Sequence, residues 1–374
     1  ETGTFPLNQF AETGPGGYTI TIQPSAAVTR LISGSTGLGL IRLDGADRVR
    51  IDGRFGGSGQ YLTFRNLSTL APTVSFVNDA QNNIVRNCIL EGNSTATTGN
   101  LGGVVNLGTT TGANGNDNNI ITFNDIRDRS DAVGRPAIGI LASGTVTTLQ
   151  QFNNNCTISN NTIHDFYIDG STGQFGVSIL TGNSGWNLDS NSIYQTVTRT
   201  NTLTGAVTRA INIQHPSPLA VNGGFNIRNN FIGGTAPGAT GGDWTLNVTP
   251  ASSIVQTFIP IAMSTGMIPN TISGNVIRNI DFTTVSPTAA ATQFAGMSLA
   301  QGLYTVSGNT IGSPTTTGNI KININVSTGT NSTSFFAGVL FGSAGPCGMD
   351  FLNNTIGSIT LAGTATAVII PQIV

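Results

Sequence analysis

The 374-residue chain has little charge and few of the residues that build helices in water. Only 9% of its residues are charged, and it contains three Glu and a single Lys, Lys321. Because isolated helices depend largely on Ala, Leu, Glu, Lys and Arg, this composition excludes a mainly helical protein. Hydrophobic residues still make up 38% of the chain and the net charge is only −2, so the signature of disorder is absent as well.

Long apolar runs, basic runs and cysteine motifs are also missing. No apolar stretch reaches the ~18 residues that a membrane span needs. With a net charge of −2 and no run of Lys or Arg, the chain lacks the basic face that nucleic acid requires. The three cysteines form no CxxC motif and leave one without a partner, which predicts neither a disulfide framework nor a zinc site. We expect an extracellular, all-β protein.

What the chain does contain is a repeat, the pattern apolar-x-x-Asn-x-apolar, which occurs eight times. Successive Asn residues of the pattern lie 30 to 45 positions apart. Asn tolerates left-handed turn geometry, and stacked amides can hydrogen-bond to one another, so we predict a structural turn ladder. The predicted ladder consists of Asn87, Asn124, Asn161, Asn191, Asn230, Asn275, Asn309 and Asn354.

A second apolar segment lies between consecutive Asn residues, for example Gly176–Leu180, so each repeat holds at least two short strands. One such unit cannot bury its apolar face alone and must stack on its neighbours. The sequence therefore predicts a parallel β-solenoid of roughly ten rungs spaced about 4.8 Å apart. We expect a single domain over residues 1–374, with leading rungs in 1–80 and the eight Asn-anchored repeats in 81–374.

The final segment, Thr366–Val374, matches the second strand of a repeat and ends in apolar residues. Solenoids protect their terminal rungs with polar caps, because an uncovered rung exposes strand edges and apolar side chains. This segment predicts either a truncated chain or a C-terminal end that stacks against another subunit.

Two segments, Leu43–Gly53 and Asn82–Gly92, resemble repeats of right-handed parallel β-helices. They are similar to the β-helix regions of large secreted or surface-exposed bacterial proteins, including adhesin-like ones, and the resemblance extends over nearly the whole chain. It implies an all-β, right-handed parallel β-helix located outside the cell or on its surface. It implies no single activity, because the same superfamily contains pectate lyases, polygalacturonases, phage tailspikes and adhesins.

We expect a non-catalytic, adhesive or structural module that contacts an extracellular polysaccharide or protein, or associates with itself end to end or laterally. The chain lacks the Asp-Asp pair and the Gly-His-Gly segment of polygalacturonases. Two alternatives stay open. One is a polysaccharide lyase or glycoside hydrolase with a groove near Asp128, His164 and Asp165, and the other is a tailspike-like trimer.

One group of ionisable residues stands out in three consecutive repeats. Counting four positions beyond the ladder Asn gives Glu91, Asp128 and Asp165, which form a carboxylate column if the repeats stack in register. Two charges about 4.8 Å apart repel by roughly 3–4 kcal/mol at an effective dielectric of about 20, so a partly buried column needs compensation.

Three interpretations of this column remain open. Arg residues neutralise it on a solvated face, it binds Ca²⁺ through oxygen ligands, or it forms an acid/base cluster with His164. Calcium is the one cofactor that we consider. Three further side chains near the column, Arg127, Tyr194 and Trp186, are candidate ligand contacts, because aromatic rings suit the apolar face of a sugar.

Overall fold

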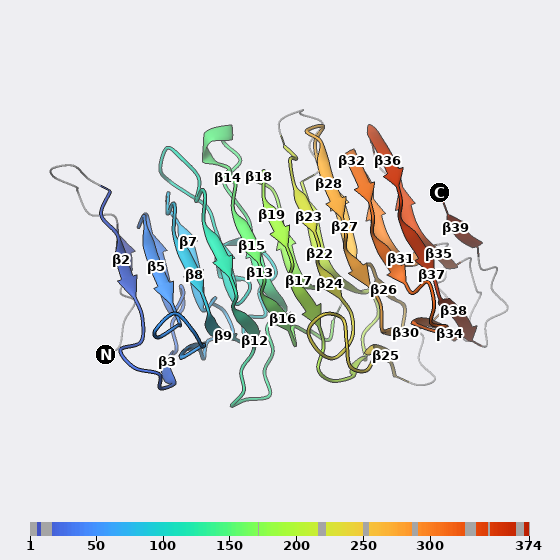
Figure 1. The fold of residues 1–374 in the computed structure, drawn as a ribbon, viewed down its shortest axis with the longest axis horizontal. Coiled ribbons are helices and arrows are strands. Elements are labelled where there is room, and N and C mark those ends of the chain that lie inside the picture. Colours follow the sequence, from blue (N-terminus) through green and yellow to red (C-terminus); the bar gives the residue numbers. More distant parts are fainter. Residues whose placement is uncertain are drawn as a thin grey trace.

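The computed structural model describes residues 6–8, 17–170, 172–215, 222–249, 254–285, 291–325, 334–342, 345–363 and 370–373. Its described residues contain no α-helix, only the short 3₁₀ turns η1 (Gly99–Leu101) and η2 (Leu149–Gln151). None of the described helical turns has the length or the apolar character to cross a membrane. Parallel strands pair along a rod, with the N-terminal residues at one end and the C-terminal residues at the other (Figure 1).

Three long sheets, which we call A, B and C, run the length of the rod. Sheet A comprises β1 (Leu7–Asn8), β4 (Ile41–Asp44), β7 (Val74–Val77), β10 (Val105–Leu107), β13 (Ile138–Ala142), β17 (Gly173–Ile179), β22 (Ala206–Gln214), β26 (Gln256–Phe258), β27 (Ile261–Ser264), β31 (Ala291–Leu299), β35 (Ser334–Phe341) and β39 (Ile370–Ile373). Sheet B comprises β2 (Ile20–Ile22), β5 (Val49–Asp52), β8 (Ile84–Arg86), β11 (Ile120–Thr122), β15 (Thr157–Ser159), β19 (Asn187–Asp189), β23 (Asn226–Arg228), β28 (Asn270–Ser273), β32 (Gly302–Ser307) and β36 (Cys347–Leu352).

Sheet C comprises β3 (Arg30–Gly34), β6 (Leu62–Asn66), β9 (Cys88–Gly92), β12 (Asp125–Asp128), β16 (Thr162–His164), β20 (Ser192–Tyr194), β24 (Phe231–Ile232), β29 (Val276–Ile277), β33 (Thr310–Gly312) and β37 (Thr355–Gly357). A shorter sheet holds β21 (Arg199–Asn201), β25 (Trp244–Val248), β30 (Ile280–Val285), β34 (Ile320–Asn325) and β38 (Ile359–Gly363), and β14 (Asn153–Asn154) pairs with β18 (Asn183–Ser184). The predicted all-β parallel solenoid is confirmed, and the ten strands described in each of sheets B and C match its roughly ten rungs. Most of the segment Thr366–Val374 lies outside the described residues.

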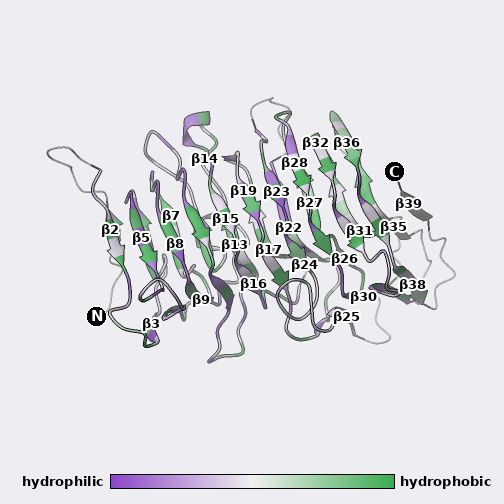
Figure 2. Ribbon diagram, in the orientation of Figure 1, coloured by the Kyte–Doolittle hydropathy of each residue, from purple (hydrophilic) through white to green (hydrophobic). Residues whose placement is uncertain are grey.

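The core is built from columns of apolar side chains, one from each rung. In sheet B, Ile121 pairs with Ile158, and in sheet C, Ile126 pairs with Ile163, and all four are fully buried. Alternate residues of each strand point outward, because successive side chains in a strand face opposite sides. Apolar segments recur from rung to rung along the rod (Figure 2). Full burial of one such side chain stabilises the fold by about 1.5–3 kcal/mol.

The turns between sheets B and C contain the Asn ladder. Oδ1 of Asn230 accepts hydrogen bonds from the backbone N–H and the side-chain amide of Asn191, at 3.0 and 2.9 Å. The amide of Asn230 in turn donates to Leu188 O and to Oδ1 of Asn275. The same contacts link the seven buried or half-buried residues Asn124, Asn161, Asn191, Asn230, Asn275, Asn309 and Asn354.

Asn87 does not belong to this ladder, so the prediction was wrong at that position. The ladder position of its rung is taken by the buried Cys88, whose backbone N–H donates to Oδ1 of Asn124 at 3.0 Å. Asn87 lies one residue earlier and has a φ of 52°. Asn suits this left-handed turn position as well as the ladder position, so residue type alone does not separate the two.

Candidate functional site

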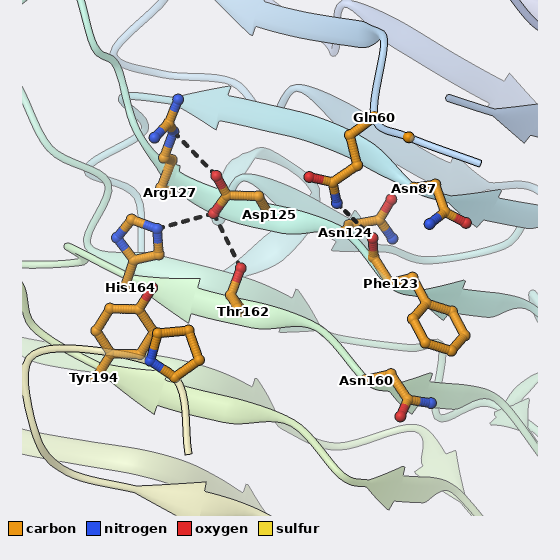
Figure 3. A pocket seen from close by; sticks show the side chains of 12 residues that line it. Gln60, Asn87, Phe123, Asn124, Asp125, Arg127, Asn160, Thr162, His164 and Tyr194 are labelled. Carbon is orange, nitrogen blue, oxygen red and sulfur yellow. Dashed lines mark hydrogen bonds and ion pairs between the residues drawn. The ribbon is translucent and has the colours of Figure 1, made fainter. Parts of the chain in front are cut away.

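A groove of about 720 Å³ lies on the outer side of sheet C and of its turns with sheet B. A loop of residues 53–61 borders it with Gly59 and Gln60, and a loop of residues 233–243 borders it with Pro237. Between these loops, four successive rungs supply the other lining residues, which are Asn87, Phe123, Asn124, Asp125, Arg127, Asn160, Thr162, His164 and Tyr194 (Figure 3).

One row of outward side chains on sheet C contributes Arg127, His164 and Tyr194 to the groove lining. Arg65 pairs in register with Glu91, Glu91 with Arg127, and, further along, His164 with Tyr194. Glu91 is only 1% exposed, and its two oxygens bond to Arg65 and to Nη2 of Arg127. Paired guanidiniums therefore neutralise the buried carboxylate of this row.

His164 lies between two carboxylates. Its Nε2 is 2.9 Å from Oδ1 of Asp125, and its Nδ1 is 2.8 Å from Oδ2 of Asp165. Burial lowers the pKa of His164, but the two hydrogen bonds and the two negative charges outweigh burial and raise that pKa to about 9. At neutral pH the ring is an imidazolium that donates both of its N–H groups.

The two carboxylates beside His164 are held by further donors. Asp165 accepts bonds from Nη2 of the buried Arg199 at 2.6 Å and from the hydroxyl of Thr196 at 2.7 Å. Burial raises the pKa of Asp165, but these donors and His164 overcome that effect and lower the pKa to about 2. Asp125 accepts a bond from the hydroxyl of Thr162, and its pKa is lowered as well, because bonding to His164 outweighs burial.

Tyr194 completes this end of the groove with an aromatic stack. Its ring lies on the ring of His164, with a centroid distance of 4.8 Å and an interplanar angle of 12°. Burial and the nearby carboxylates of Asp125 and Asp165 raise the pKa of the Tyr194 phenol. The phenol therefore stays protonated at neutral pH, and its ring is held in place by a charged imidazolium.

The predicted carboxylate column is absent, because the register at β9 differs from the predicted one. Glu91 pairs with Arg127 rather than with Asp128. The cause is the offset at Asn87, since counting four positions from Asn87 gives Glu91, one residue short of Gly92, which is the partner of Asp128. The prediction that Glu91, Asp128 and Asp165 share one column is therefore wrong.

The prediction of calcium binding rested on the column of Glu91, Asp128 and Asp165, which the structure does not contain. Within the described ranges, no three His, Cys, Asp or Glu side chains are grouped as ligands for a metal ion. The oxygens of Glu91 are bonded to guanidiniums, and Asp165 is bonded to Arg199. Calcium binding stays an untested prediction.

The structure brings two residues of the alternative catalytic interpretation, His164 and Asp165, into contact, and the charge of Asp165 also acts on Asp128. His164 lines the groove, whereas Asp128 and Asp165 do not. Asp165 contacts His164, and Asp128 lies 3.8 Å from Nε of Arg135. Burial, followed by the charge of Asp165, raises the pKa of Asp128 to about 6.

Of the three predicted ligand contacts, Arg127 and Tyr194 line the groove, but Trp186 does not. Trp186 is fully buried, and its indole N–H donates to Asn153 O at 2.7 Å. The prediction of Trp186 as a ligand contact is therefore wrong, because its ring belongs to the core.

Sequence reasoning missed Asp125, Phe123, Gln60, Asn87 and Asn160 as lining residues. Asp125 directly follows a ladder Asn, at the first outward position of its strand, so counting outward positions finds it. Phe123 stands where other repeats carry Asn, Ser or Gly before the ladder residue. Gln60 comes from a loop, and nothing in the sequence brings it to Phe123.

No family model matches the chain, and no curated protein matches its sequence. A structure of PfbA, a surface adhesin of Streptococcus pneumoniae, is similar at 12% identity and a TM-score of 0.44, over 91% of this chain and 73% of that one. A second PfbA structure is similar at 10% identity and a TM-score of 0.45, over 96% and 80%. The A-module of the mannuronan C-5 epimerase AlgE6 from Azotobacter vinelandii is similar at 12% identity and a TM-score of 0.34, over 92% and 91%. These similarities concern the parallel β-helix fold.

Proposed function

We propose that this parallel β-helix is an extracellular or cell-surface module that holds a glycan chain in the groove on sheet C and does not cleave it. The observation that carries the proposal is the state of His164. Both of its ring nitrogens are bonded to carboxylates, and its ring stacks on Tyr194. An imidazolium fixed in this way supports an aromatic surface but has no free nitrogen with which to accept a proton.

The lining of the groove suits carbohydrate. Sugars present hydroxyl groups at their edges and C–H groups on their faces, so their sites combine polar side chains with aromatic rings. Asn87, Asn160 and Thr162 supply amides and a hydroxyl, and Phe123 and Tyr194 supply rings. The position of the groove on a rigid sheet keeps these groups in fixed register.

The same contacts disfavour the lyase and glycosidase alternative. A general acid or base works best when its pKa lies near the working pH. In the groove, the pKa of His164 is raised to about 9 and that of Asp125 is lowered, so neither exchanges a proton readily near pH 7. Asp128, whose pKa of about 6 would suit such a role, does not line the groove.

A steric block tests the proposal. We expect the wild-type chain to bind at least one member of a panel of immobilised homopolymers of glucose, mannose, galactose, xylose, galacturonate and mannuronate. Thr162→Trp fills the groove from an outward position of β16 and should abolish that binding. Thr157→Trp, in β15 of the same rung but on sheet B, is the matched control and should bind as the wild type does.

Two results contradict the proposal. One is a wild-type chain that binds no member of the panel. The other is a Thr162→Trp variant that binds as tightly as the Thr157→Trp control, because the bound glycan then lies outside the groove.

A further inference from the structure

The residue before each ladder position has a positive φ, and Phe123 is exceptional among these residues. Its φ is 56°, close to the values of the neighbouring turns. The same position in other rungs holds Asn, Ser or Gly, in Asn87, Asn160, Ser190, Asn229, Gly274, Gly308 and Asn353. Left-handed backbone geometry is unfavourable for a bulky side chain, so Phe123 is strained where Asn or Gly is not.

Burial of the ring does not explain the strain. The Phe123 side chain is 50% exposed and lines the groove. Phe123 contributes to the turn through its backbone. The N–H of Phe123 donates to Ser159 O, and the carbonyl of Phe123 accepts a bond from Nε2 of Gln60 at 2.8 Å. Any residue retains these two bonds, so the turn itself does not require a phenyl ring. Backbone strain that the hydrogen bonds of a turn do not require is typical of functional positions.

Two side-chain amides flank the ring. Asn87 and Asn160 hold the same turn position in the rungs directly before and after Phe123, at a spacing of about 4.8 Å. Figure 3 shows the Phe123 ring between the two amides. Neither amide forms a hydrogen bond with any residue that the structure describes, in contrast to the amides of the ladder residues Asn124 and Asn161.

We propose that Phe123 is the stacking platform for one pyranose ring of the glycan, with the amides of Asn87 and Asn160 bonding to its hydroxyl groups. This inference rests on the proposed function and names the ligand class, a neutral hexose with an unsubstituted C–H face. Aromatic faces suit such a surface, and primary amides both donate to and accept from hydroxyls.

The charges of the groove support a neutral sugar. Arg127, the guanidinium that lines the groove, contacts Glu91 at 3.1 Å and Asp125 at 3.5 Å. His164 is matched by Asp125 and Asp165. A uronate carboxylate would compete with these partners, whereas hydroxyl groups next to Phe123 meet two unused amides.

The test uses Phe123→Asn, which installs the residue found in the neighbouring turns. We expect this variant to melt higher than the wild type, by roughly 2 °C, because the left-handed strain is relieved. We expect its affinity for the neutral homopolymer that the wild type binds to fall about tenfold. Phe123→Tyr keeps an aromatic face and should retain wild-type affinity. Asn229→Ala, at the same turn position but outside the groove lining, is the control and should also bind normally.

Each outcome decides one point. Unchanged affinity of Phe123→Asn, in a chain whose binding is abolished by Thr162→Trp, overturns the role of Phe123 and leaves the proposed function intact. Binding of only the galacturonate or mannuronate polymers overturns the neutral ligand class. A wild-type chain that binds nothing overturns both the inference and the proposed function.

Discussion

Nε2 of His164 donates a hydrogen bond to Oδ1 of Asp125 across 2.9 Å and thereby joins two adjacent strands of sheet C. The bond belongs to a chain of alternating charges that runs from Arg65 through Glu91, Arg127 and Asp125 to His164, and from there through Asp165 to Arg199. Each charge in this chain has a partner of opposite sign, so these side chains are paired ions rather than free catalytic groups. This pairing leaves His164 and Asp125 in the groove without a free partner atom for proton transfer between them and a substrate.

The first prediction concerns pH. The folded-state pKa of His164 is about 9, above its ordinary 6.5, so its contribution to stability is fully present below pH 6.5 and is lost as the pH rises to 9. Asp165, with a pKa of about 2 against 3.8, contributes fully above pH 3.8 and loses its contribution as the pH falls to 2. Urea unfolding should show that the wild type loses on the order of 3 kcal/mol between pH 6.5 and 9, and His164→Gln much less.

His215→Gln is the control for this prediction. Burial lowers the pKa of His215 to about 4, so that residue titrates only on the acid side of pH 6.5 and should leave the alkaline loss unchanged. An alkaline loss of the same size in His164→Gln would show that His164 is not the group responsible.

The second prediction concerns the Asn ladder. Asn230→Ala removes the partners of the backbone N–H of Asn191 and of Leu188 O, which lie inside the rod. Because each buried unpaired group costs about 1–3 kcal/mol, the free energy of unfolding should fall by roughly 3 kcal/mol. Asn226→Ala, which removes only an outward bond to Asn187, should cost less than about 0.5 kcal/mol. Equal losses in the two variants would contradict a structural role for the ladder.

The third prediction concerns calcium. Because guanidiniums already bond to Glu91 and Asp165, we expect added Ca²⁺ to leave the melting temperature unchanged and to release no heat in calorimetric titration. A rise in melting temperature that a chelator reverses would contradict this expectation and restore calcium as a ligand.

The core and most of the ladder can be predicted from the sequence, because both need one residue type at one recurring position. Ile121, Asn124 and Ile126 carry this signal in a single short segment. The predicted register was wrong in the rung of Asn87, where the Asn could occupy either of two turn positions. Asn87 fits the left-handed turn position as well as the ladder position, and the buried Cys88 gives no sign that it replaces a ladder Asn.

The site could be predicted only in part. His164 and Tyr194 were found because they lie just beyond ladder residues, where outward side chains of sheet C occur. Trp186 was misassigned because an aromatic residue type does not reveal whether the ring faces solvent or core. The contact of Gln60 with Phe123 joins residues 63 positions apart through a loop, and no local pattern encodes it.

The most direct test of the central claim, that the groove holds a glycan without cleaving it, is the fate of the bound polymer. The wild-type chain is incubated near neutral pH with the homopolymer that it binds, and chain length and ultraviolet absorbance of unsaturated ends are followed over time. A groove that only binds the glycan should leave the polymer fully recoverable at its original length, with no new absorbance. Shortened or unsaturated products that disappear in His164→Gln would contradict this claim and would identify the groove as an active site.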